Sequence, residues 1–120
     1  MANQYLLWVM ADIIPIHHGS ELPCAMTDQE LVVLVRQLVE EGGRLVVKEH
    51  CYDRMEERDI SMAQIRQVLL RGEVTRGPTW TEFRNWGFTM RADAAGQLVT
   101  VGGAIDVDLL GQSVLVLTVY

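Results

Sequence analysis

The sequence predicts one α+β domain, in which an antiparallel β-sheet meander packs against two to three helices. Apolar residues recur at helical spacing in the first part of the chain, whereas strand-like segments separated by turn-prone residues fill the part after residue 72. The length of 120 residues suits a single domain, and 49% hydrophobic with 22% charged residues is typical of a globular chain rather than a disordered one. We therefore expect one domain over residues 27–120, preceded by an N-terminal arm or added strand over residues 1–26.

The first predicted helix follows Thr27. Thr27 and Glu30 have the spacing of a capping box, in which each side chain bonds the backbone N–H of the other. Apolar residues then recur three and four positions apart, at Leu31, Leu34, Val35, Leu38 and Val39. Gly42-Gly43 ends the pattern, and the run at residues 45–47 suits a short strand.

Residues 50–74 predict two further helices. His50, Arg54 and Arg58 recur at a spacing of four, which stacks side chains along one helix face. Ser61 and Gln64 predict a capped second helix, and Gly72 is expected to end it in a left-handed backbone conformation. Four strands follow, expected at residues 74–81, 82–91, 97–107 and 113–120, with a hairpin turn at 93–96.

The central segment resembles domain-of-unknown-function family 4258 over about residues 44–120. The matching residues are His50, Arg54-Met55, Glu57-Arg58, Ile60-Ser61 and Gly72-Glu73-Val74. This family looks related to the small bacterial ribonuclease toxins RelE, BrnT and MqsR. The resemblance implies a RelE/MqsR toxin-like fold, endoribonuclease activity on messenger RNA, and neutralisation by a cognate antitoxin protein.

RNA cleavage without a metal needs a base for the 2′-hydroxyl proton and cations for the phosphate. His50 is the candidate acid or base, since the unperturbed pKa of histidine is about 6.5, and Arg54 and Arg58 are the candidate phosphate ligands. Four residues are expected to bind RNA beside this catalytic group: Lys48, Arg84, Trp86 and Arg91. No metal or cofactor is expected, because neither cysteine has a ligand partner at zinc-site spacing.

Each candidate also has a structural interpretation. His50 can cap or bond a neighbouring strand, Arg54 and Arg58 can form helix-face ion pairs with nearby acids, and Trp86 can pack the sheet against helices. Tyr120 is a further possible donor, although packing is the commoner role of such a residue. The sequence leaves these alternatives open.

The charge distribution supports a second class of function. Residues 44–91 hold nine basic and seven acidic side chains, a net charge of +2, whereas the remainder carries −8. An acidic surface of this kind suits a noncatalytic protein of phage or mobile-element origin that inhibits a basic nucleic-acid-binding protein complex. In either function the N-terminal segment lacks a basic leader and a cleavage site, so we expect a cytoplasmic protein that does not enter the membrane.

Overall fold

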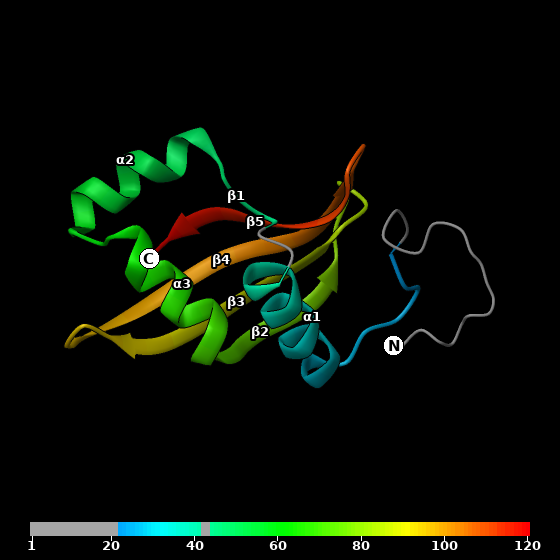
Figure 1. Ribbon diagram of the computed structural model, residues 1–120, viewed down its shortest axis with the longest axis horizontal. Coiled ribbons are helices and arrows are strands. Elements are labelled where there is room, and N and C mark those ends of the chain that lie inside the picture. The colour runs from blue at the N-terminus through cyan, green and yellow to red at the C-terminus, as the bar shows by residue number, and fades with distance from the viewer. Residues whose placement is uncertain (1–21, 42–43) are drawn as a thin grey trace.

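The computed structural model describes residues 22–41 and 44–120, and it has the predicted α+β architecture (Figure 1). Three helices and five strands follow one another as α1 (Asp28–Glu40), β1 (Leu45–Val47), α2 (Glu49–Arg58), α3 (Met62–Arg71), β2 (Glu73–Trp80), β3 (Trp86–Ala94), β4 (Gln97–Asp108) and β5 (Gly111–Val119). The N-terminal arm predicted over residues 1–26 lies outside the described residues, except for residues 22–26.

The sheet has the strand order β1-β5-β4-β3-β2. Strands β2 to β5 form the predicted antiparallel meander, but β1 pairs with β5 in parallel, so the whole sheet is mixed. The chain leaves β1 through two helices and returns along β5 only after three further strands, and this long connection is what a parallel pair requires. The prediction gave the meander and a short strand at residues 45–47, and the structure adds that this strand pairs in parallel with β5.

Helices α1 and α3 cover one face of the sheet and contact each other (Figure 1). Their buried side chains, such as Leu31, Val35, Ile65 and Leu69, meet the inward residues of the strands in one core. Both predicted capping boxes are present, at Thr27 with Glu30 and at Ser61 with Gln64. The opposite face of the sheet carries no helix within the described part of the chain.

Helix α2 lies beside β5 rather than over the sheet. Strand β1 pairs only with Val114–Val116, so α2 continues where β1 stops and buries Cys51 and Met55 towards the core. Asp59, in the left-handed conformation with φ of 56°, ends this helix. The path of the chain thus sets α2 along the second half of β5, at the border of the helix-free face.

Gly72 ends α3 for a different reason from the one predicted. Its φ is −79°, which is not left-handed, so the expected conformation was wrong. A methyl group at position 72 would lie 2.5 Å from the carbonyl oxygen of Val68 and 2.8 Å from that of Arg91. Glycine is required here because the end of α3 approaches the backbone of β3 closely.

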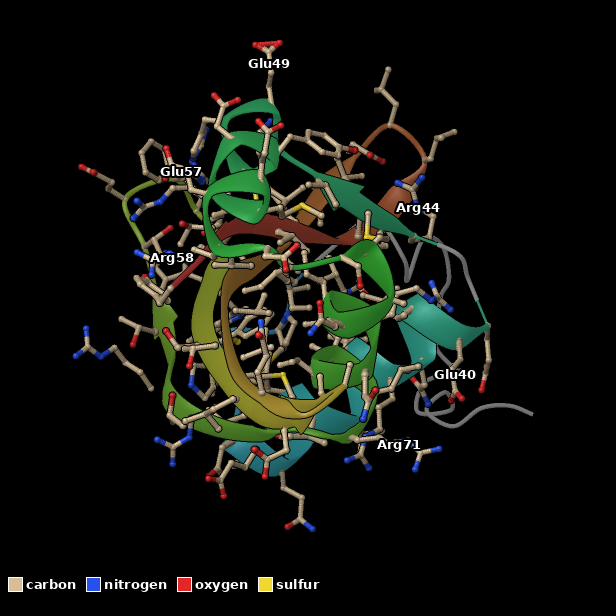
Figure 2. All side chains as sticks on the ribbon, turned by 90° about the vertical axis from the view of Figure 1, so that its left-hand side faces the viewer. Glu40, Arg44, Glu49, Glu57, Arg58 and Arg71 are labelled. Atoms are coloured by element: carbon tan, nitrogen blue, oxygen red, sulfur yellow. The ribbon has the colours of Figure 1, made fainter. Side chains whose placement is uncertain are left out.

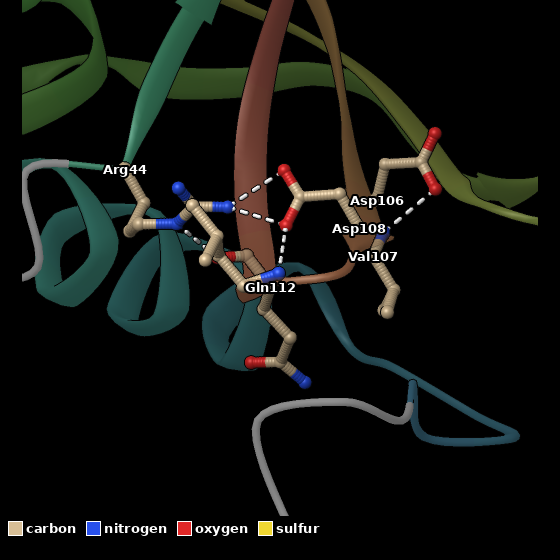
Figure 3. Close-up of polar contacts among 6 residues, drawn as sticks. Arg44, Asp106, Val107, Asp108 and Gln112 are labelled. Carbon is tan, nitrogen blue, oxygen red and sulfur yellow. Dashed lines mark hydrogen bonds and ion pairs between the residues drawn. The ribbon is translucent and has the colours of Figure 1, made fainter.

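An ion pair joins Arg44, which directly precedes β1, to Asp108 at the end of β4 (Figure 3). Nη2 of Arg44 donates to both carboxylate oxygens of Asp108, at 2.6 and 2.7 Å, and Nε donates to the carbonyl of Gln112 at 3.3 Å. The backbone N–H of Leu110 also donates to Asp108 at 2.8 Å. The Leu110 N–H and the Arg44 guanidinium hold the pKa of the Asp108 carboxyl below its usual range.

We expect Asp108→Asn to lower the free energy of unfolding at neutral pH and to leave it unchanged in acid. The folded-state pKa is depressed, so the carboxylate stabilises the fold above the unfolded-state pKa of about 3.9, and this contribution is lost as pH falls through the folded-state value. Urea titrations of both proteins at several pH values measure the difference. An effect of equal size at every pH would contradict the charged interaction as its source.

Candidate functional site

Helix α2 brings the three predicted catalytic residues onto one exposed flank. Cys51 and Met55 anchor the helix in the core, and the spacing of four puts His50, Arg54 and Arg58 together beside that anchor. His50 and Arg58 are exposed and Arg54 is half-buried. The flank is therefore open to solvent along the whole helix.

The polar contacts of these residues are few. Nη1 of Arg54 lies 3.7 Å from Oε1 of Glu57 one turn along, and the two side chains are 42% and 64% exposed. Within residues 22–41 and 44–120, the side chains of His50 and Arg58 make no hydrogen bond or ion pair. The imidazole and the two guanidinium groups are consequently not sealed inside the protein with carboxylate partners.

The flank faces the helix-free side of the sheet. Arg58 lies on the side of α2 that points away from α1 and α3, as Figure 2 shows. Because α2 continues in the direction of β1, and β1 is parallel to β5, the helix ends near the end of β5 (Figure 1). The end of the flank at Arg58 therefore lies near the end of β5, at the border of the helix-free face.

Side chains of the helix-free face alternate with core residues along each strand. Phe88, Met90, Val99 and Val101 belong to the core, so the residues between them point to the other side. The strand register aligns them in rows across the sheet, and two of these rows contain an arginine. These two rows are Glu73, Arg91, Thr100 and Tyr120, and Arg76, Thr89, Gly102 and Thr118.

The predicted RNA-binding residues do not form one surface. Arg91 lies on the helix-free face, where Nη2 bonds Oε1 of Glu73 at 3.2 Å, and Lys48 is exposed just before α2. Arg84 is exposed in the β2–β3 loop, at the far end of the strands from the end of β5. Trp86 is only 8% exposed and donates from Nε1 to the carbonyl of Pro23 at 3.0 Å, so its indole is a packing group and not an open stacking surface.

The β2–β3 loop carries an exposed aromatic residue, Phe83, and Trp80 lies at the end of β2 just before the loop. Phe83 is 74% exposed at its tip, and Trp80 packs edge-on against Trp86 with ring centroids 5.2 Å apart. Thr81 donates from its hydroxyl group and its backbone N–H to Asn85, and it accepts from the backbone N–H groups of Phe83 and Arg84. This protruding loop is separate from the α2 flank.

Two other features bear on the chemistry available. No group of three His, Cys, Asp or Glu side chains in the described ranges is arranged to hold a metal ion. A depression of about 400 Å³ on α3 is lined by Ala63, Arg66, Gln67, Leu70 and Arg71, and it belongs to the helix layer rather than to the α2 flank. The flank thus offers an imidazole for proton transfer and guanidinium groups for an anion.

Comparison with known proteins gives a family. The family model described as Domain of unknown function (DUF4258) matches residues 47–120. No curated protein and no solved structure matches the chain. None of the helices that the structure describes has the length and apolar character needed to cross a membrane. Because the match covers more than half of the chain, including α2 and the whole meander, the protein belongs to the DUF4258 family.

Proposed function

We propose that this protein is a toxin-like endoribonuclease of a toxin–antitoxin system that cleaves RNA without a metal ion. The proposal is carried by one observation, which is the exposed flank of α2 with His50, Arg54 and Arg58 side by side. An imidazole beside two guanidinium groups combines a proton-transfer group with anion ligands. A cognate antitoxin would act by covering this flank.

In the proposed reaction, His50 takes the proton from the 2′-hydroxyl group of the substrate. The 2′-oxygen then forms a bond to the adjacent phosphorus, and the bond from phosphorus to the 5′-oxygen breaks. Arg54 and Arg58 bind the phosphate oxygens as negative charge develops on them. Water gives a proton to the departing 5′-oxygen, and the protonated His50 returns its proton to the resulting hydroxide, leaving a 2′,3′-cyclic phosphate and a 5′-hydroxyl end.

The pairing of Arg54 with Glu57 does not prevent this role. The two groups are 3.7 Å apart and exposed, and an exposed pair of this kind contributes little to stability. A phosphate group can therefore replace the Glu57 carboxylate as the partner of Arg54. Arg58 has no charged partner in the described part of the chain, so a phosphate group can bind it without displacing a carboxylate.

The direct experiment is incubation of the purified protein with end-labelled single-stranded RNA, with and without a chelator. We expect cleavage that the chelator does not reduce, and products that carry the cyclic phosphate, because His50, the arginines and water supply the whole chemistry. RNA with 2′-O-methyl riboses serves as the control substrate and should remain intact. Cleavage that requires a divalent ion, or no cleavage of any RNA, would contradict the proposal.

A second candidate function rests on the carboxylates of the same helix. Glu49, Asp53, Glu56 and Asp59 are exposed around α2 and make no ion pair within the described residues. An acidic helix of this kind suits the noncatalytic inhibitor, which would bind a basic nucleic-acid-binding protein through charge complementarity. A salt-sensitive complex with such a partner, together with intact RNA in the experiment above, would favour this function.

A further inference from the structure

Tyr120 lies on the helix-free face in a defined position. Its backbone N–H donates to the carbonyl of Thr100 at 3.0 Å, which extends the pairing of β5 with β4 to this residue. A methyl group on Gly102 would lie 3.2 Å from both Cε2 and Oη of Tyr120, so the ring lies over the glycine. The side chain is nevertheless 56% exposed. Tyr120 is thus an aromatic ring supported from below by the sheet and open above.

Positive charge lies on the same face. In the two rows across the strands, Arg91 is two strands from Tyr120, a separation of about 10 Å, and Arg76 is one strand further on β2. Arg91 shares its charge with Glu73 at 3.2 Å in an exposed pair, whereas Arg76 has no ionic partner among residues 22–41 and 44–120. Three arginines, counting Arg58 of α2, stand against three acids that the strand alternation places on the same face, Glu73, Asp93 and Asp106. The positive charge is therefore local to Arg76 and Arg58, whose guanidinium groups have no ionic partner among the described residues.

The residues between the charges are small or carry hydroxyl groups. Gly102 and Ala104 line the middle of the face, and Ala104 is only 1% exposed although no described helix covers it. Thr89, Thr100 and Thr118 surround Gly102 and can donate hydrogen bonds to phosphate or ribose oxygens. A polar surface with one supported aromatic ring and separated guanidinium groups matches the features that bind single-stranded nucleic acid.

We propose that the helix-free face is the binding surface for single-stranded RNA, with a base stacked on Tyr120 and neighbouring phosphates on Arg76 and Arg91. The surface begins beside Arg58, because α2 ends near the end of β5, and it leads the strand to the α2 flank. The inference rests on the proposed function for the identity of the ligand. It assigns a separate role, which is substrate binding away from the reacting phosphate.

The experiment measures binding of a fluorescent 2′-O-methyl RNA of about ten nucleotides, which the proposed reaction cannot cleave. We expect Tyr120→Ala to weaken binding about 5- to 150-fold, the range for loss of one stacked base, and Tyr120→Phe to keep wild-type affinity. Arg76→Gln should reduce the salt dependence of the binding constant by about 0.7 in a log–log plot, as loss of one phosphate contact requires. Arg66→Gln removes a guanidinium from α3 on the opposite face and is the matched control, expected to bind as the wild type does.

The outcomes separate this inference from the proposed function. His50→Ala should bind the uncleavable RNA as tightly as the wild type, because it changes the chemistry and not the binding face. Cleavage of ordinary RNA with no effect of Tyr120→Ala or Arg76→Gln on binding would overturn the inference alone. Binding that depends on Tyr120, without cleavage of any RNA, would uphold the inference and overturn the proposed activity. Equal losses for Arg76→Gln and Arg66→Gln would overturn the assignment of the face.

Discussion

His50→Ala and Arg58→Ala should each abolish RNA cleavage while leaving the thermal midpoint of the protein nearly unchanged. His50 supplies the base in the proposed reaction, and loss of a general base lowers the rate about 10²- to 10⁴-fold. Loss of a charged group that stabilises the transition state costs a similar factor of about 10²- to 10³-fold. Initial rates on labelled RNA measure both effects, and growth arrest on expression should disappear in parallel.

A loss of activity in these variants can be assigned to the reaction and not to unfolding, since neither side chain makes a contact that stabilises the fold. Both residues are exposed, and their side chains make no hydrogen bond or ion pair in the described ranges, so their truncation leaves no buried group unsatisfied. Arg66→Gln on α3 is again the control for loss of one exposed guanidinium. If both variants lost their folded structure instead, the residues would have structural roles. If both kept full activity, the catalytic site would lie elsewhere.

The site was predictable from sequence as far as local periodicity reaches. A spacing of four placed His50, Arg54 and Arg58 on one helix flank, because the helix repeat alone fixes which side chains are neighbours. The same reasoning gave both capping boxes, since their hydrogen bonds join residues three positions apart. These features depend on contacts within one element.

Contacts between elements were not predictable in the same way. Strand alternation shows that Trp86 and Gly87 point to opposite faces, but it does not say which face the helices cover. Trp86 therefore became an RNA-binding candidate, although it packs in the core against residues 22–26. For the same reason the sequence favoured a packing role for Tyr120, since its position over Gly102 depends on the register of β4 with β5. The parallel direction of β1 likewise follows from a pairing more than 60 residues apart in the chain.

Gly72→Ala is the second substitution with a large expected effect, because it should lower the free energy of unfolding by about 3 kcal/mol. The added methyl group would lie 2.5 Å from the oxygen of Val68 and 2.8 Å from that of Arg91. Both neighbours are backbone atoms, one in α3 and one in β3, so neither can rotate away. The helix must separate from the strand at the point where Val68 and Leu69 are buried.

Gly96→Ala is the matched control for this prediction. Gly96 has a φ of +84° and no atom within 4 Å of an added methyl group, so its substitution tests backbone strain without a clash. The expected cost is about 1 kcal/mol, the penalty for an L-residue in the left-handed region. Gly72→Ala should therefore lower the melting temperature by roughly 10 °C, well beyond the change in Gly96→Ala. A smaller loss at Gly72 than at Gly96 would mean that α3 and β3 do not approach as closely as the backbone distances require, and that Gly72 has another role than packing.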